Sequence, residues 1–416
     1  MHQFLSEMIF MSEEKLVPKL RFSGFDEDWV SYKIGDISKT YSGGTPSTSK
    51  REYYKGNIPF IKSGEIGNEV TEQYINEEAI NNSSAKKVQK GDLLLALYGA
   101  TSGEVAISKI DGAINQAVLK IDNKMNNYFQ YNYFVKYKDQ IIHKYLQGGQ
   151  GNLSANIIKK LEFYYPNLEE QQKISNYLLL IDNKIELLEK KHNEYQNFKK
   201  YLMQQIFAQK LRFLEFTKVW KSTKIGEIAD IVGGGTPRTE VEEYWDGEIK
   251  WFTPSEIGKT KYIFDSKRHI TDKGLKNSSA KLLPKDTILL SSRATVGEIS
   301  IALTECSTNQ GFQSLITKNN VDNDFIYYLI STIKNEFLRR SSGSTFLEIS
   351  KNEIKRIPIN IPELSEQNKI SNLFSAIDNK IEMLEKKHQY YQDFKKYLMQ
   401  RIFSSQDDKL RIVCTS

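Results

Sequence analysis

Residues 166–207, PNLEEQQKISNYLLLIDNKIELLEKKHNEYQNFKKYLMQQIF, recur as residues 362–403, PELSEQNKISNLFSAIDNKIEMLEKKHQYYQDFKKYLMQRIF. Thirty of the 42 aligned positions are identical. The stretches that precede the two copies are related much more loosely. The chain is therefore predicted to hold two divergent modules, each followed by the same long segment, as if one scaffold carried two different heads.

Both copies of this segment have the pattern of a long helix with one apolar seam. Apolar residues recur every three or four positions, the spacing of a coiled coil, and no Pro or Gly interrupts either copy. Asn167 and Ser365 stand where N-caps are expected, followed by acidic residues that the helix dipole favours. Each helix should be about 60 Å long at 1.5 Å per residue. The seam consists of Ile174, Leu178, Ile181, Ile185, Leu188, His192, Tyr195, Phe198, Leu202 and Ile206 in the first copy, and of Ile370, Phe374, Ile377, Ile381, Leu384, His388, Tyr391, Phe394, Leu398 and Ile402 in the second.

Each seam needs a partner, and the nearest one is the duplicate of the same helix. An internal duplication usually packs about a pseudo-two-fold axis, which predicts an antiparallel pair with one module at each end. His192 and His388 interrupt the seams at matching points, and we interpret them as paired polar residues that set the register. The expected architecture is two oppositely oriented heads held apart by a stiff rod.

The duplication extends into the modules as short landmarks in a fixed order. The sequences between the landmarks differ freely, so the chain is a two-fold duplication with a period of about 195 residues and not a solenoid of short repeats. The landmarks are LRF at 20–22 and 211–213, Trp29 and Trp220, KIG at 33–35 and 224–226, GGTP at 43–46 and 234–237, SSAK at 83–86 and 278–281, and NQ at 115–116 and 309–310.

Strand and helix patterns are mixed within each module. Residues 93–97 and 288–290 are short apolar runs typical of buried strands, and 105–107 and 299–301 follow as second strands after a Gly turn. Residues 128–145 and 325–337 are each predicted as an aromatic-rich helix. The predicted fold class is mixed α/β, with an internal pseudo-two-fold repeat. After a tail at 1–17, globular α/β domains at 18–165 and 211–361 alternate with long helices at 166–210 and 362–416, which form an antiparallel coiled coil.

Composition describes an ordered globular protein. The 416 residues are 39% hydrophobic and 12% aromatic. No stretch approaches the roughly 18 uncharged apolar residues of a membrane span, and the N-terminus lacks the pattern of a signal peptide. Cys306 and Cys414 cannot form a disulfide framework and have no CxxC companion for zinc, so a cytoplasmic location is expected. The net charge of +6 is compatible with a nucleic-acid partner without arguing strongly for one.

Taken in order, these motifs resemble the specificity subunit of type I restriction-modification systems. The resemblance covers nearly the whole chain and rests on LRF, KIGDI and KIGEI, GGTP, DLLLALYGATSG and TILLSSRATVG, EQQKISNYL and EQNKISNLF, and IDNKIE. It implies two target-recognition domains, each reading one half of a bipartite double-stranded DNA site. It also implies that the helices set the gap and dock two methyltransferase subunits, while restriction-translocase subunits join the full complex. The chain itself would have no catalytic role and no cofactor, because S-adenosylmethionine, ATP and Mg are expected on the partner subunits.

Loops of the two modules contain candidate DNA contacts. Tyr98 and Arg293 occupy matching positions just past a buried strand, where Arg suits guanine and Tyr would read differently. The loops at 147–152 and 339–344 hold amide and Arg side chains suited to base edges or phosphate, and basic residues near aromatics suit phosphate. The predicted DNA-binding residues are Lys50, Arg51, Lys55, Tyr98, Gln147, Gln150, Asn152, Arg238, Lys259, Lys261, Arg268, Arg293, Arg339, Arg340 and Ser344.

Several of these motifs also have a purely structural interpretation. The GGTP loops are either phosphate cradles or tight turns where only Gly fits. We interpret the NQ pairs as structural because both modules share them, and Trp245 and Trp251 as core residues. Lysine pairs beside the seam form either a solvated helix face or a docking surface for the methyltransferase. The predicted docking residues are Lys190, Lys191, Lys199, Lys200, Lys386, Lys387, Lys395 and Lys396.

Other functions fit these residues less well. An enzyme is disfavoured, because the chain has no [ND]PP[YF] motif for amine methylation, no glycine-rich cofactor loop and no evident nuclease cluster. A coiled-coil scaffold without DNA recognition would lack basic and amide-rich loops, and both modules have them. A specificity subunit of a fused system, with both activities on one partner chain, stays open because the difference lies in the partner.

Overall fold

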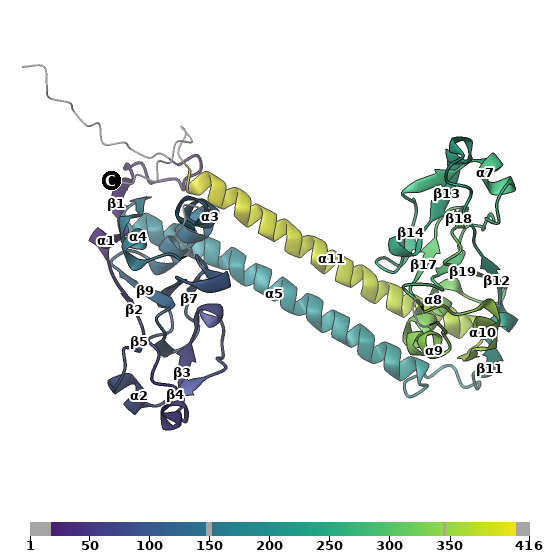
Figure 1. The fold of residues 1–416 in the computed structure, drawn as a ribbon, viewed down its shortest axis with the longest axis horizontal. Coiled ribbons are helices and arrows are strands. Elements are labelled where there is room, and N and C mark those ends of the chain that lie inside the picture. The colour runs from purple at the N-terminus through teal and green to yellow at the C-terminus, as the bar shows by residue number, and fades with distance from the viewer. Residues whose placement is uncertain (1–17, 147–151, 344–346, 405–416) are drawn as a thin grey trace, which may run out of the picture. The chain divides into compact units, whose positions relative to one another are not determined.

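The computed structural model describes residues 18–146, 152–343 and 347–404, and the chain divides into two compact units. The first unit runs to Leu188 and resumes at Lys387, and the second comprises Glu189–Lys386. The two long helices, α5 (Leu168–Phe207) and α11 (Leu364–Ile402), therefore each contribute one part to each unit (Figure 1). The predicted segment boundaries follow the sequence repeat and stay a prediction, and the predicted tail at 1–17 lies outside the described residues.

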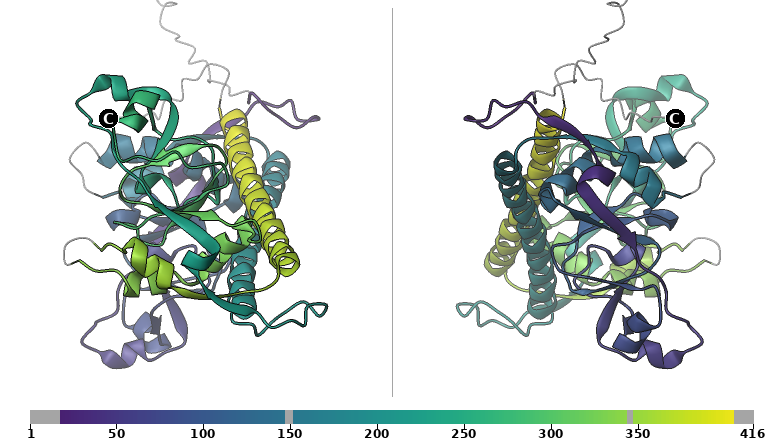
Figure 2. Two further views of the ribbon diagram at one scale, coloured as in Figure 1. Left: turned by 90° about the vertical axis from the view of Figure 1, so that its right-hand side faces the viewer. Right: turned by 90° about the vertical axis from the view of Figure 1, so that its left-hand side faces the viewer.

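The first unit contains three small sheets, seen from this unit's side in the right-hand view of Figure 2. The largest has the order β2 (Ser38–Ser42), β9 (Val118–Asn123), β6 (Leu93–Ala96) and β7 (Val105–Ile107), with all neighbours antiparallel. The second has the order β4 (Tyr74–Ile75), β3 (Ile58–Ile61), β8 (Gly112–Ile114) and β5 (Lys86–Val88), with β3 and β8 parallel, and the third pairs β1 (Val30–Lys33) with β10 (Glu162–Tyr165). The helical elements are α1 (Ile34–Ile37), η1 (Arg51–Tyr54), η2 (Ser63–Glu65), α2 (Glu77–Asn81), η3 (Gly99–Thr101), α3 (Asn127–Leu146) and α4 (Ala155–Lys160).

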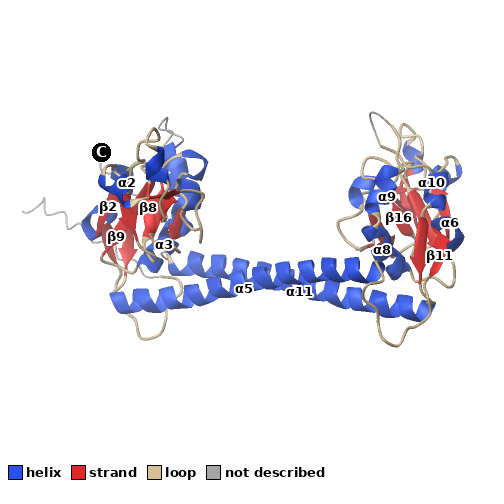
Figure 3. Ribbon diagram, turned by 90° about the horizontal axis from the view of Figure 1, so that it is seen from below, coloured by secondary structure: helices blue, strands red, loops and turns tan. Residues whose placement is uncertain are grey.

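The second unit repeats this plan, and its strands and helices are distinguished by colour in Figure 3. Its main sheet has the order β12 (Ala229–Gly233), β19 (Gln313–Thr317), β16 (Ile288–Leu290), β17 (Ile299–Ala302) and β14 (Tyr262–Ile263). A second sheet has the order β15 (Arg268–Ile270), β13 (Trp245–Phe252) and β18 (Cys306–Thr308), and β11 (Lys221–Lys224) pairs with β20 (Pro358–Ile361). The helical elements are α6 (Ile225–Ile228), η4 (Glu242–Tyr244), η5 (Pro254–Glu256), α7 (Asp272–Lys276), α8 (Asn323–Thr332), α9 (Lys334–Arg339) and α10 (Lys351–Arg356).

The short apolar runs form central strands because both of their faces are covered. All four residues of β6 and all three of β16 are buried, as the sequence predicted. The aromatic helix at 128–145 is confirmed as α3. Its Tyr133 packs against Phe163, and both Phe129 and Tyr133 pack against Phe403, the residue after α11. The single helix predicted at 325–337 is wrong. The chain forms α8 and α9 there, separated by a turn at Ile333.

In each unit, α5 and α11 lie antiparallel and share the unit's main core. In the first unit, Lys395 Nζ lies 2.7 Å from the Asp182 carboxylate, and Lys184 lies over the ring of Tyr391. Residue numbers rise from Asp182 to Lys184 along α5, whereas those of the α11 residues that they contact fall from Lys395 to Tyr391. The two helices therefore run in opposite directions. The second unit repeats the ion pair between Lys199 and Asp378 at 2.5 Å.

The predicted seam holds for most positions, with one clear exception. Ile174, Leu178 and Ile181 join the core of the first unit, and Leu202 and Ile206 join that of the second. Phe198 was predicted in the seam, and this is wrong, because its side chain is 49% exposed. The next residue, Lys199, turns inward instead and pairs with Asp378.

The helix starts explain why the LRF landmark recurs. Arg21 binds the buried Glu170 of α5 through two hydrogen bonds of 2.8 and 2.7 Å, and Arg212 binds the buried Glu366 of α11 with the same distances. The arginine of each LRF motif therefore binds the first turn of a long helix.

Only one of the two predicted N-caps is correct. Asn167 caps α5 by accepting a hydrogen bond of 2.9 Å from Glu170 N. Ser365 is not the cap of α11, because the helix already begins at Leu364 and the carbonyl of Glu363 accepts the first intrahelical bond from Gln367 N.

Candidate nucleic-acid interface

One edge of the main sheet in the first unit brings together several loops that the sequence singled out. Because β2 and β6 are both antiparallel to β9, the end of β2, the start of β9 and the end of β6 meet at the same edge. This edge carries the GGTP loop, the NQ turn and the turn after β6 that contains Tyr98. We call it the loop edge.

The opposite edge of the same sheet leads to the long helix. After β9 the chain reaches Asn126, whose backbone N–H donates to Gln171 Oε1 of α5 at 3.0 Å. The second unit matches this, since Asp322 N donates to Gln367 Oε1 of α11 at 3.0 Å. The loop edge of each unit is thus the sheet edge away from the start of its long helix.

The second unit has an equivalent loop edge. The end of β12, the start of β19 and the end of β16 meet there, because β19 is antiparallel to both neighbours. The second GGTP loop, the second NQ turn and the turn that contains Arg293 are therefore neighbours. Local patterns along the chain identified these loops one by one, and the sheet topology places them together.

The landmarks shared by the modules form the frame of this edge. Thr45 Oγ1 donates to Gln116 Oε1 at 2.6 Å, so the GGTP loop is tied to the NQ turn, and the second unit repeats the bond at 2.5 Å. A Cβ on Gly43 would lie 1.7 Å from the carbonyl oxygen of Ile114, and one on Gly235 would lie 2.5 Å from the backbone nitrogen of Ala280 in the SSAK turn. Glycine is required because these backbones touch, which favours the structural interpretation of GGTP and NQ.

Two backbone donors of the GGTP loops are already used within the protein. Gly43 N donates to Asn115 O at 3.1 Å, and Gly235 N donates to Thr308 O at 2.8 Å. These loops are therefore packed turns that support the edge. This favours the structural interpretation of the loops over an open phosphate cradle.

The turn after β6 and its counterpart after β16 combine one backbone shape with different side chains. Gly99 and Ala294 occupy equivalent positions and both adopt positive φ, 81° and 60°. The residue just before them is Tyr98 in the first unit, 37% exposed, and Arg293 in the second. A shared frame with a variable exposed residue is what sequence-dependent reading needs.

Residues that follow the predicted DNA loops form hydrogen bonds to these turns. Leu153 N donates to Leu97 O at 3.1 Å, next to Tyr98, and Ile349 N donates to Ser292 O at 3.0 Å, next to Arg293. The exposed Asn152 is thereby tied to the same edge as Tyr98. The predicted contacts Gln147, Gln150 and Ser344 lie outside the described residues.

Arg293 is held by one side of its guanidinium only. Its Nε lies 2.8 Å from Glu348 Oε1, and the two side chains are 46% and 42% exposed. Within the part of the chain that the structure describes, the terminal nitrogens donate no hydrogen bond. The outer edge of the guanidinium is therefore free for two parallel hydrogen bonds, the geometry that guanine accepts.

The other predicted arginines of the second unit differ in their exposure and in their ion-pair partners. Arg238, directly after GGTP, is exposed, and Arg339 is 77% exposed although it contacts Glu336. Arg340 does not fit a DNA contact. It binds Glu336 at 2.7 Å and Glu353 at 3.5 Å and so links α9 to α10, and its hydrogen bond lowers the pKa of Glu336.

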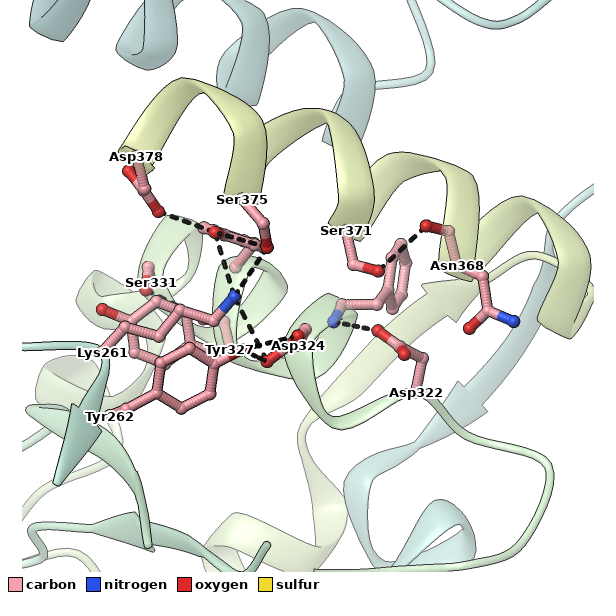
Figure 4. A network of polar contacts seen from close by, with 12 residues as sticks. Lys261, Tyr262, Asp322, Asp324, Tyr327, Ser331, Asn368, Ser371, Ser375 and Asp378 are labelled. Atoms are coloured by element: carbon pink, nitrogen blue, oxygen red, sulfur yellow. Dashed lines mark hydrogen bonds and ion pairs between the residues drawn. The ribbon is translucent and has the colours of Figure 1, made fainter. Parts of the chain in front are cut away.

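Lys261 is the clearest correction among the predicted DNA contacts. Its side chain is 11% exposed, and its Nζ donates to Tyr328 Oη at 3.1 Å and to Ser375 Oγ of α11 at 3.0 Å (Figure 4). It also pairs with Asp324 at 3.2 Å, and burial lowers the pKa of the ammonium group. Lys261 therefore joins the module to α11 within the second unit, whereas neighbouring Lys259 is exposed.

Arg268 also contacts its own unit. Its guanidinium lies 3.5 Å over the ring of Trp245, which is 7% exposed, and Trp251 is 5% exposed. The prediction that both tryptophans are core residues is confirmed. The guanidinium of Arg268 packs on these tryptophans, so this cation already contributes to the packing of its own module.

Two cations of the first unit line a hollow beside its GGTP loop. Lys50 and Lys55 are exposed, and Lys50 donates to Tyr53 Oη at 2.8 Å, a hydrogen bond that raises the pKa of Lys50. Arg51 lines the hollow itself. Lys62 does too, and sequence reasoning missed it because a single lysine after an apolar strand carries no local signal. The full lining is Thr45, Thr48, Arg51, Tyr54, Phe60, Lys62, Gln73 and Asn115.

Six of the eight lysines predicted to dock a partner are exposed on the long helices, and two are not available. The exposed ones are Lys190, Lys191, Lys200, Lys386, Lys387 and Lys396. The prediction is corrected for Lys199 and Lys395, whose side chains are 23% and 13% exposed. They bind Asp378 and Asp182, which also accept hydrogen bonds from Tyr328 and Tyr128. Both are thus part of the helix packing.

No metal-binding cluster of His, Cys, Asp or Glu is present in residues 18–146, 152–343 and 347–404. Cys306 is buried, which raises the pKa of its thiol to about 12, and Cys414 lies outside the described residues. Among the helices of those same ranges, none is long and apolar enough to cross a membrane.

Comparisons with known proteins agree with the duplicated architecture. A family model described as type I restriction modification DNA specificity domain matches residues 26–197 and again 217–390. The MjaIX type I restriction enzyme specificity subunit of Methanocaldococcus jannaschii is 40% identical over 176 residues, a match that spans 41% of each chain. The putative MjaX specificity subunit of the same organism is 26% identical over 436 residues, covering 97% of this chain and 98% of the relative.

Solved structures share the fold. The S subunit of a type I restriction-modification system from M. genitalium superposes with a TM-score of 0.62 at 16% identity, over 94% of this chain and 100% of that chain. A chain from a structure titled for complex assembly and conformational transition of the type I R-M system gives 0.56 at 16% identity, over 91% and 98%. The predicted mixed α/β class with long helices is confirmed by this likeness.

Proposed function

The chain belongs to the family of type I restriction modification DNA specificity domains, and from this premise we propose that it is the subunit that recognises DNA for a restriction-modification complex. Each unit presents one loop edge to one half of a bipartite, gapped site in double-stranded DNA. Its role is recognition, without chemistry of its own. S-adenosylmethionine, ATP and Mg act on the partner subunits, and the complex works in the cytoplasm.

The observation that carries this proposal is the pair of equivalent turns with Tyr98 and Arg293. Both turns stand on the same frame of GGTP, SSAK and NQ contacts, and both place a half-exposed side chain at the same point. A scaffold that only bound proteins would have no reason to keep the frame and vary this residue. Two heads that read different bases would, because Tyr and Arg offer different hydrogen-bonding edges.

The long helices supply the spacing and the docking surface in this proposal. The ion pairs Asp182–Lys395 and Asp378–Lys199 are the same contact made once in each unit, so the helix packing is duplicated along with the sequence. Two nearly identical helix surfaces suit two copies of one methyltransferase subunit. The exposed lysines at 190, 191, 200, 386, 387 and 396 are the proposed contacts. Two solved structures with this fold carry titles of type I systems.

The direct test is modified-base mapping of the source genome with and without this gene. Loss of methylation at one bipartite, gapped motif supports the proposal and identifies both half-sites. A genome map that does not change, together with a purified complex that methylates no DNA, contradicts it.

Purification of the complex then identifies the partner. Separate methyltransferase and translocase chains indicate a type I complex, whereas one chain with both activities indicates the fused system. Lys190→Glu with Lys386→Glu should reduce methyltransferase recovery, while Lys199→Glu should instead disturb the helix pair, because Lys199 is bound to Asp378.

A further inference from the structure

The hollow beside the first GGTP loop has an unusual excess of unpartnered donors. Arg51 lines it and, among the described residues, makes no hydrogen bond or ion pair. Lys62 lines it as well, and its nearest carboxylate is Glu72 at 3.9 Å, which is 84% exposed. An exposed carboxylate at that distance neutralises a lysine only weakly.

The rest of the lining adds neutral donors and no acid. The Thr48 hydroxyl and the Gln73 amide have no partner within the described part of the chain. Asn115 uses its Oδ1 to accept from Ala117 N at 3.0 Å, which leaves its NH₂ group for a ligand. None of the lining residues is Asp or Glu. A hollow of two cations and several neutral donors is complementary to an anion with several oxygens.

The second unit has different side chains at the equivalent positions. The two modules can be aligned here through equal contacts: Lys62 N and Thr253 N each donate to a glutamate three residues on, and Phe60 and Trp251 pair with equivalent residues of the neighbouring strand. At the equivalent positions Trp245 replaces Tyr54 and Trp251 replaces Phe60.

The charged residues differ in the same way. Glu242 stands at the position of Arg51, Thr253 at that of Lys62, and Arg268 at that of Gln73. The guanidinium of Arg268 covers the Trp245 ring at 3.5 Å, and both tryptophans are buried. The second module thus packs this region with large side chains and an acid nearby, while the first leaves it open and cationic.

We propose that the Arg51–Lys62 hollow binds one phosphate of the DNA backbone next to the half-site read by the first module, with no counterpart in the second. The inference rests on the proposed DNA recognition and adds an asymmetry to it. The hollow adjoins the GGTP loop and the NQ turn through Thr45 and Asn115, so a phosphate held there would fix the strand beside the loop edge that carries Tyr98. The salt dependence of binding then differs between the two halves of the site.

The test is a neutral-linkage scan with the full chain and a duplex that contains the methylated motif. Each phosphate in turn is replaced by an uncharged methylphosphonate, and affinity is measured for the wild type, for Arg51→Gln and for Lys62→Gln. The control is Lys39→Gln, which removes one exposed positive charge of the same module at the far end of β2.

In the wild type, neutral linkages at one or two adjacent positions beside one half-site should weaken binding roughly tenfold. In Arg51→Gln that loss is already present, so the same linkages should cost no more than about twofold further, and the slope of log K against log salt should fall by about 0.9. Lys62→Gln should behave alike, and Lys39→Gln should keep the wild-type scan.

The inference is overturned if Arg51→Gln and Lys62→Gln bind motif DNA with wild-type affinity, or if each still shows the full tenfold loss at the same linkages. Failure of the proposed function looks different, because the wild type itself would then show no preference for the motif over a scrambled duplex. Arg51 is exposed, so its substitution leaves the fold intact, which circular dichroism checks.

Discussion

Replacing Arg293 with alanine should relax recognition at one base position in one half of the DNA site. Glu348 holds the Nε of Arg293 at 2.8 Å and leaves both terminal nitrogens free, so the side chain is oriented for a bidentate contact with guanine. Loss of such a contact costs about 1–3 kcal/mol, or roughly 5- to 150-fold in preference for the correct base. Glu348→Gln should cost less at the same position, because it weakens the orienting pair and keeps the reading group.

The assay is competition binding with duplexes that carry each of the four bases at every position of the motif. Arg293→Ala should flatten the preference at one position and leave all positions of the other half-site unchanged. The control is Arg356→Gln, which changes an arginine that is 70% exposed on α10. This helix packs against α6, which leads into the start of β12 away from the loop edge. It should leave every base preference unchanged.

Two results would refute this reasoning about Arg293. A uniform loss of affinity across all sequences would mean that Arg293 binds phosphate, which carries no sequence information. Wild-type preference at every position would mean that the Arg293–Glu348 pair only packs the turn.

Three further predictions concern stability and spacing. Leu373→Tyr should raise the free energy of unfolding of the second unit by about 0.5–1.5 kcal/mol in urea titrations. Leu373 and Phe213 line an apolar hollow, and a Tyr–Phe pair occupies the equivalent place in the first unit. An unchanged free energy of unfolding would mean that the new ring stays in solvent. Gly235→Ala should destabilise the same unit by about 1–3 kcal/mol or more, since its Cβ would lie 2.5 Å from a backbone nitrogen of the SSAK turn, and an unchanged midpoint would contradict the close approach. Inserting seven residues after Lys190 and seven after Lys386 should lengthen the gap in the methylated motif by about 3 base pairs, because seven residues add about 10.5 Å; an unchanged gap would exclude the helices as the spacer.

Much of the fold could be predicted because its signals are local. The seam of each long helix repeats every three or four residues, and the apolar runs at 93–97 and 288–290 have the shortness and apolar composition typical of buried strands. The break at Ile333 was missed, because no Pro or Gly marks it and the turn between α8 and α9 is set by packing.

The candidate site could be predicted only in part. Tyr98 and Arg293 were singled out by their matching positions in the duplicated sequence, and the structure leaves both half-exposed at the loop edge. Lys261 and Arg340 were assigned to DNA because of their charge, but Lys261 pairs with Asp324, and Arg340 binds both the nearby Glu336 and Glu353 of α10. Lys62 was overlooked because a single lysine after an apolar strand carries no local signal. Charge is visible in a sequence, whereas the group that neutralises it is not.

The sequence by itself determined the duplication, the helix seams and the division into a shared frame and variable loops, because these are properties of neighbouring residues or of the two copies compared. Only the tertiary structure decided that Lys199 and Lys395 are held inside the helix pair and that Arg51 remains free. The reason is physical. Whether a charged side chain is available to DNA or to a partner depends on which residue, often more than a hundred positions away, the fold places within a few ångströms of it.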